Sequence, residues 1–99
     1  MNEKVKIEPF KSNEEFYVYV DCLRIELNEK GFSKTSQELN FILHETAYTT
    51  SSEFFGEIKF ALLSLKENAG KKLSTELLEN VNMCLTTIEN AFDRANSKS

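Results

Sequence analysis

The spacing of the apolar residues limits most strongly what this chain can fold into, because it repeats every three or four positions in four separate segments. Such spacing places the apolar side chains on one side of an α-helix, which can then be buried. The stripe of the last segment consists of Leu77, Leu78, Val81, Cys84, Leu85, Ile88 and Phe92. The sequence therefore predicts an all-α fold.

Capping residues and glycines indicate where the four helices begin and end. Ser74 can accept a backbone N–H that is unpaired in the first turn of the last helix. Three hydroxyl residues are followed three positions later by a glutamate, as in a capping box: Ser12–Glu15, Thr35–Glu38 and Thr50–Glu53. Gly31 and Gly70 stand where helices commonly end in a left-handed residue. These signals predict helices near 12–30, 35–48, 51–68 and 74–95.

The stretch FYVYV, residues 16–20, is ambiguous, because β-branched and aromatic residues could also alternate as a strand. The turns between the predicted helices are short, and short turns force neighbouring helices to reverse direction. A chain of 99 residues has room for one core. We therefore expect an antiparallel four-helix bundle in a single domain over 1–99, with 1–10 as an extended or disordered arm and 96–99 as a frayed tail.

The charge of the chain argues against several classes of partner. Its formal net charge is −4 and Lys71–Lys72 is its only adjacent basic pair, whereas nucleic-acid binders cluster Lys and Arg. No apolar run approaches the ~18 residues of a membrane span, and the N-terminus lacks the apolar run of a signal peptide. We therefore expect a cytoplasmic protein that binds neither nucleic acid nor membrane. An acidic surface favours a basic protein partner.

Residues that could support catalysis or bind a metal are few. His44 and Glu45 begin the zinc-protease pattern H-E-x-x-H, but Tyr48 stands where the second histidine is needed. Cys22 and Cys84 lie too far from His44 in the sequence to complete a zinc site. Both cysteines fall in apolar stripes, so we expect them to be buried, reduced thiols. The sequence predicts no catalytic residue, no metal and no cofactor, and hence no enzyme.

Three glutamates near the middle of the chain could form one acidic group. Glu53 and Glu57 are four residues apart on one side of the helix predicted at 51–68, and Glu45 precedes them. Acid–base catalysis by such a pair needs a deep cleft, which a small bundle rarely encloses. The remaining interpretations are ordinary solvated charges and an acidic docking face, with Tyr48 as an interface anchor or a core residue. We assign partner binding to Glu45, Tyr48, Glu53 and Glu57.

Gly56 lies inside a predicted helix, where glycine costs roughly 1 kcal/mol relative to alanine. We expect another helix to approach closely at this position. The alternative is that Gly56 leaves space for a side chain of a partner.

The segment AYTTSSEFFGEI, residues 47–58, resembles one that recurs in small, mostly uncharacterised bacterial helical proteins and continues there into a hydrophobic helix. The likeness covers about residues 39–65. In size, acidity and helical character the chain is also similar to immunity proteins that neutralise colicins or contact-dependent inhibition toxins. This similarity implies an immunity protein that binds and blocks a basic nuclease-type toxin domain. A helical adaptor or regulatory subunit without a toxin partner is the alternative.

Overall fold

A computed structural model of the chain describes residues 13–47 and 51–97. These residues form four α-helices and no strand. The helices are α1 (Asn13–Glu29), α2 (Ser33–Asn40), α3 (Ser51–Ala69) and α4 (Thr75–Ser97). The predicted all-α fold is therefore confirmed. FYVYV lies within α1, so the strand alternative is wrong.

Two short helical turns complete the described structure. The π-helical turn η2 (Phe41–Glu45) continues α2, and the 3-10 turn η3 (Gly70–Lys72) follows α3. The expected arm at 1–10 lies outside the described residues, as do residues 98–99 of the expected tail. The helix α4 extends through Ser97, two residues into the expected tail at 96–99.

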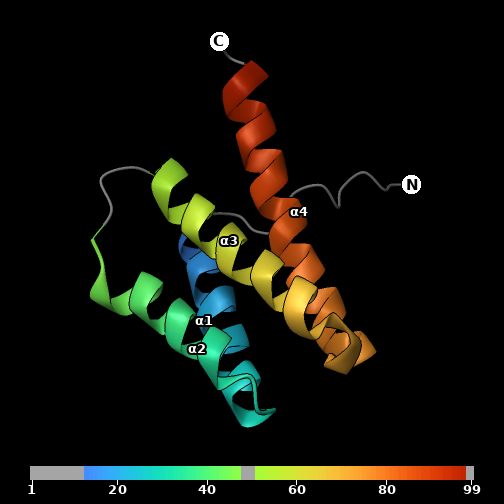
Figure 1. The fold of residues 1–99 in the computed structure, drawn as a ribbon. Coiled ribbons are helices and arrows are strands. Elements are labelled where there is room, and N and C mark those ends of the chain that lie inside the picture. Colours follow the sequence, from blue (N-terminus) through green and yellow to red (C-terminus); the bar gives the residue numbers. More distant parts are fainter. Residues whose placement is uncertain (1–12, 48–50, 98–99) are drawn as a thin grey trace.

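Each helix runs back against the one before it in the chain (Figure 1). The first two helices form one hairpin and the last two form another. The two hairpins pack together through contacts of α2 with α3 and of α1 with α4. Towards the C-terminus, α4 continues beyond the other helices.

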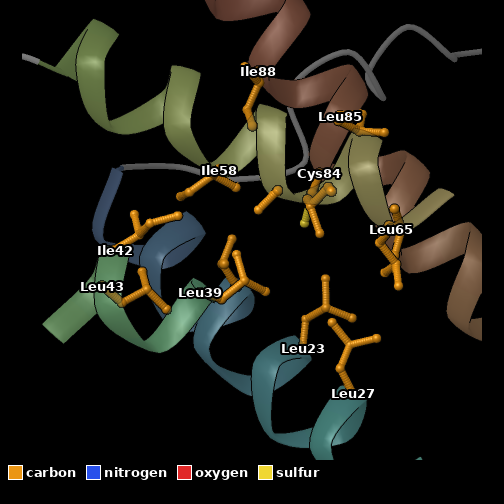
Figure 2. Packing of buried hydrophobic residues seen from close by; sticks show 14 of the residues in the cluster. Leu23, Leu27, Leu39, Ile42, Leu43, Ile58, Leu65, Cys84, Leu85 and Ile88 are labelled. Carbon is orange, nitrogen blue, oxygen red and sulfur yellow. The ribbon is translucent and has the colours of Figure 1, made fainter. Parts of the chain in front are cut away.

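The core lies where the apolar stripes of the four helices meet (Figure 2). Most of the predicted stripe residues are buried, although Phe54, Leu78 and Phe92 are only partly buried against the core. Thr46 is half-buried and Ala47 is exposed, because the backbone becomes extended at Thr46, with φ −125° and ψ 137°. The buried core residues are Phe16, Val20, Leu23, Leu27, Leu39, Ile42, Leu43, Phe55, Ile58, Ala61, Leu62, Leu65, Leu73, Leu77, Val81, Cys84, Leu85 and Ile88.

Gly31 ends α1 as predicted. Its φ is +96°, a conformation that costs little only for glycine. The Gly31 N–H donates to the carbonyl of Asn28 at 3.2 Å, and the Phe32 N–H donates to the carbonyl of Leu27 at 2.8 Å. These two bonds form a Schellman motif, which satisfies carbonyl groups at the helix end. Phe32 packs against the core, so the motif also fixes how the chain enters α2.

The predicted capping box at the start of α2 is wrong. The Schellman motif leaves so short a turn that α2 already begins at Ser33, with Phe32 at the N-cap and no side-chain cap hydrogen bond. Thr35 therefore lies inside the first turn, where it is 7% exposed. The predicted end at residue 48 is also wrong, because the helical conformation of η2 ends at Glu45.

The turn between α3 and α4 confirms one prediction and contradicts another. Ser74 caps α4, since its Oγ accepts the N–H of Leu77 at 3.1 Å. Gly70 does not end α3 in a left-handed conformation, because Ala69 is the last residue of α3 and Gly70 begins the turn η3. At the other end of α3 the expected cap residue, Thr50, lies outside the described residues.

Candidate functional site

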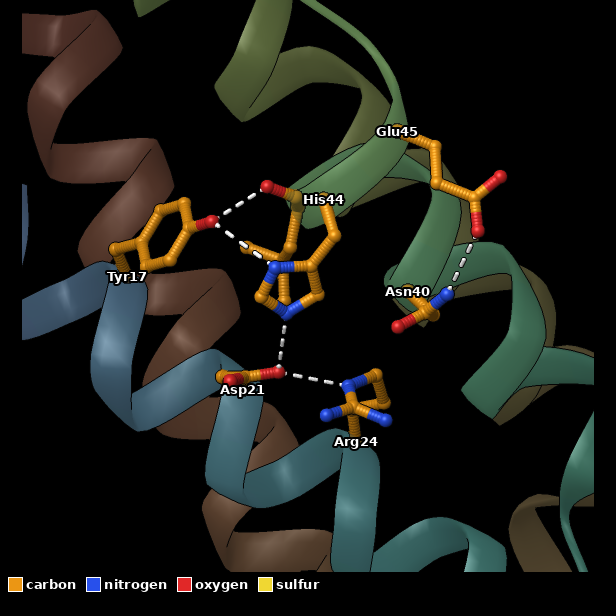
Figure 3. Close-up of polar contacts among 7 residues, drawn as sticks. Tyr17, Asp21, Arg24, Asn40, His44 and Glu45 are labelled. Carbon is orange, nitrogen blue, oxygen red and sulfur yellow. Dashed lines mark hydrogen bonds and ion pairs between the residues drawn. The ribbon is translucent and has the colours of Figure 1, made fainter.

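The structure describes three of the four predicted partner-binding residues. Glu45, Glu53 and Glu57 are all exposed, and Tyr48 lies outside the described residues. Glu45 accepts a hydrogen bond from Nδ2 of Asn40 at 3.1 Å, which holds it on its own segment (Figure 3). Of these three glutamates, only Glu57 lines the groove between the α2–η2 segment and α3, although Glu53 lies one turn before it on α3.

An open groove of about 510 Å³ separates the α2–η2 segment from α3. Its volume lies within the range of roughly 300–1,000 Å³ that ligand-binding clefts have. Apolar side chains from both segments line it, and one basic and two acidic side chains are among its polar residues. The lining residues are Lys34, Gln37, Glu38, Phe41, Ile42, Glu57, Phe60 and Ala61.

Two phenylalanines in this groove are far more exposed than core residues. Phe60 is 72% exposed and Phe41 is 55% exposed, while Leu63, one turn after Phe60 on α3, is 44% exposed. Exposed apolar patches on small proteins commonly mark interaction sites. Neither phenylalanine was among the predicted partner-binding residues, although the sequence contained a signal. Both phenylalanines are bulky aromatics that fall between the predicted stripe positions of their helices.

Gly56 contributes to the open character of this side of α3. A Cβ atom built at Gly56 would meet no atom within 4 Å. The expectation that another helix approaches closely at Gly56 is therefore wrong. Gly56, Phe60 and Leu63 are spaced four and three residues apart, which places them along one side of the helix. The open space at Gly56 thus continues the exposed apolar side of α3.

On the side of α3 that faces α4, the ammonium group of Lys59 contacts two residues of α4. Nζ of Lys59 lies 2.7 Å from Oε2 of Glu89 and 5.7 Å from the centroid of the Phe92 ring. The ammonium group thus lies close to a carboxylate and over the face of an aromatic ring, both supplied by α4. Such an arrangement combines an ion pair with a cation–π contact.

The only histidine belongs to a polar cluster between α1 and η2 (Figure 3). Nε2 of His44 lies 3.0 Å from Oδ1 of Asp21, and the same oxygen accepts a hydrogen bond from Nε of Arg24 at 2.7 Å. The Tyr17 hydroxyl donates to the carbonyl of Leu43 and lies 3.4 Å from Nδ1 of His44. The cluster therefore joins the middle of α1 to the end of η2.

This cluster resembles an acid–histidine–hydroxyl relay in composition, but its hydrogen bonds serve a structural purpose. The proton of the Tyr17 hydroxyl is directed at a backbone carbonyl, not at the imidazole of His44. Burial raises the pKa of Asp21, but hydrogen bonds from His44 and Arg24, together with their charges, outweigh burial and lower it. Asp21 is therefore a stable carboxylate that anchors two neighbouring side chains.

The two cysteines differ in their surroundings. Cys84 is buried as predicted, and this burial raises the pKa of its thiol to about 12. The prediction that Cys22 is buried is wrong: it is exposed on α1. Val18 and Ile25 lie four and three residues from Cys22 and are 59% and 46% exposed, so α1 carries a second apolar stripe opposite its core face.

Neither a metal site nor a membrane span is found within the described ranges. No three His, Cys, Asp or Glu side chains of residues 13–47 and 51–97 are grouped so that they could hold a metal ion. None of the helices described in these ranges has both the length and the apolar character needed to cross a membrane. Comparison of the chain with protein-family models, curated proteins and solved structures finds no match.

Proposed function

We propose that this chain is an immunity protein that binds a basic nuclease-type toxin domain in the cytosol and blocks its active site. The groove between α2 and α3 supports this proposal most directly. It exposes Phe41 and Phe60 to solvent and has Glu38 and Glu57 among its lining residues. Exposed aromatic side chains supply binding energy at protein interfaces, while carboxylates around them favour a basic partner and speed its encounter.

The proposed mechanism is mimicry of the phosphates that a nuclease binds. Glu53 and Glu57 are exposed on successive turns of α3, so both can face the same partner surface. Their carboxylates would take the place of substrate phosphates among the Lys and Arg side chains of the toxin. Glu45 and Tyr48, which precede α3 in the chain, complete the proposed set of contacts.

The alternative is a helical adaptor or regulatory subunit without a toxin partner. The second apolar stripe on α1, formed by Val18, Cys22 and Ile25, favours this alternative, because an adaptor that joins two proteins needs two separate faces. The genes next to that of this chain separate the two proposals. A toxin domain encoded immediately upstream favours immunity, and an operon of unrelated enzymes favours the adaptor.

The direct test is protection of bacterial cells from the toxin domain encoded next to this chain. We expect the toxin domain alone to arrest growth and co-expression of this chain to restore it. The double variant Glu53→Lys/Glu57→Lys should lose protection. The double variant Glu29→Lys/Glu67→Lys, which changes the net charge equally at two exposed positions that do not line the groove, should retain it. Full protection by the first variant would contradict the assigned face, and no protection by the unmodified chain would contradict immunity.

A further inference from the structure

The two walls of the groove carry the same pair of side chains at the same spacing. On the wall formed by α2 and η2, Glu38 is followed three residues later by Phe41. On the α3 wall, Glu57 is followed three residues later by Phe60. Residues three apart are neighbours on a helix surface, so each wall presents a carboxylate next to an aromatic ring. The groove is thus lined by two rings and two carboxylates.

A glutamate–phenylalanine pair already binds a cation elsewhere in this chain. On the other side of α3, Lys59 lies over the Phe92 ring and pairs with the carboxylate of Glu89, which is three residues before Phe92 on α4. The same glutamate–phenylalanine spacing therefore binds a cation within this fold. In the groove no ion pair joins Glu38 or Glu57 to a cation of the described residues, and Phe60 remains 72% exposed.

We infer that the groove receives an arginine side chain of the partner, stacked against Phe41 and Phe60 and paired with Glu38 and Glu57. Arginine fits better than lysine, because its planar guanidinium stacks on aromatic faces and can bind two carboxylates at once. Its apolar stem would lie against Ile42 and Ala61. Lys34 also lines the groove, but two carboxylates against one ammonium group leave the lining net negative.

A second copy of this chain is a poorer occupant of the groove. Two copies that met symmetrically through this face would bring the acidic pairs of both together, on proteins that each carry a net charge of −4. A basic side chain on a different protein neutralises the same carboxylates. The inference rests on the proposed function, since it takes the partner to be basic, and it adds which side chain the groove recognises.

The experiment is an NMR titration of the full ¹⁵N-labelled chain with acetyl-Leu-Arg-Leu-amide. The matched control peptide replaces arginine with citrulline, which has nearly the same shape but no charge. We expect shift changes centred on the amides of Phe41 and Phe60, and binding of the citrulline peptide weaker by about tenfold, because charged hydrogen bonds are roughly twice as strong as neutral ones. A lysine peptide should bind several-fold more weakly than the arginine peptide.

Two variants of α3 test the residues. Glu57→Gln should weaken binding of the arginine peptide several-fold, whereas Glu67→Gln, an equal change at another exposed position of the same helix, should not. Equal binding of the citrulline peptide, equal effects of the two variants, shift changes centred on Val18 and Ile25, or no shift changes at all would each overturn the inference. Dimerisation of the chain that Phe60→Ala abolishes would also overturn it, because a second copy would then occupy the groove.

The outcomes also separate this inference from the proposed function. Protection of cells by the chain without arginine-specific binding in the groove would leave immunity standing and overturn the inference. Arginine-specific binding in the groove without protection against the neighbouring toxin domain would support the inference and contradict immunity.

Discussion

On the side of α3 that faces α4, Lys59 pairs with Glu89 and lies over the Phe92 ring, so carboxylate, ring and cation all belong to the fold. On the side that faces α2, Glu57 and Phe60 line an open groove, and no ion pair joins Glu57 to a cation of the described residues. The same combination of side chains can therefore join two helices or remain open to solvent. We propose that the open side binds a partner.

The same contrast holds for the apolar residues of α3. Ile58 and Leu62 are completely buried, whereas their near neighbours Phe60 and Leu63 are 72% and 44% exposed. Hydrophobicity alone therefore does not tell which of these residues serve folding. Their position relative to the buried stripe distinguishes them. Substitutions on the two sides of α3 test how much the sides differ.

The largest expected effect is that of Leu62→Ala. Leu62 lies in the core with 0% exposure, and truncating such a leucine costs about 2–5 kcal/mol of the free energy of unfolding. Leu63→Ala removes the same atoms from the exposed side and should cost less than about 1 kcal/mol. Denaturant titration of the two variants measures both values. Equal losses would contradict the division of α3 into a folding side and an open side.

Gly31→Ala should have the next largest effect. Gly31 has φ +96°, and a left-handed backbone costs a residue with a Cβ atom roughly 1–2 kcal/mol. A Cβ atom there would meet nothing within 4 Å, so the whole loss is expected to come from the backbone. Thermal unfolding of the variant checks this expectation. An unchanged melting temperature would show that the Schellman motif does not need glycine.

Gly56→Ala should have the opposite sign. Gly56 lies within α3, a Cβ atom there would meet nothing within 4 Å, and alanine is favoured over glycine in helices by about 1 kcal/mol. We therefore expect the free energy of unfolding to rise by up to about 1 kcal/mol, measured by the same titration as for Leu62→Ala. A loss of stability would mean that another helix does approach this side of α3.

A smaller effect is expected from the polar contacts of Asp21, which pairs with Arg24 within α1 and joins α1 to η2 through His44. The pKa of Asp21 is lowered in the folded chain, so its stabilising contribution is present above the ordinary value of 3.8 and is lost as the pH falls through the lowered pKa. Asp21→Asn should cost less than about 1 kcal/mol at pH 7, because the pairs are partly exposed. The difference from the unmodified chain should shrink in acid, and a difference that grows there would contradict the assignment.

Sequence patterns predicted the helices well because burial of one stripe per helix is a local property. Ser74 and Gly31 were also predictable, since their roles depend on the backbone next to them. The start of α2 was not predictable in this way. Because the turn after Gly31 is short, α2 begins earlier than predicted, and Thr35 lies inside the helix. Cys22 was assigned to the core because α1 carries apolar residues on two sides, and periodicity alone does not show which side the other helices cover.

The candidate site was predicted only in part. Glu57, which was predicted to bind a partner, lines the groove, but Phe41 and Glu38, which line it from another segment, were not part of that prediction. Their proximity depends on how the two helical hairpins pack, which spacing within one segment does not reveal. The contacts of His44 with Asp21 were missed for the same reason, as 23 residues separate the two.

We propose that the exposed side of α3 serves binding and not folding, and Phe60→Ala tests this proposal when stability and binding are measured on one sample. The unfolding free energy should change by less than about 0.5 kcal/mol, as for an exposed surface residue, while binding of acetyl-Leu-Arg-Leu-amide is lost. Phe55, which is 9% exposed and packs edge-on against Phe16, provides the scale, because Phe55→Ala should cost about 3–5 kcal/mol. A loss of stability as large as that of Phe55→Ala, or unchanged peptide binding, would show that the exposed side of α3 does not have this role.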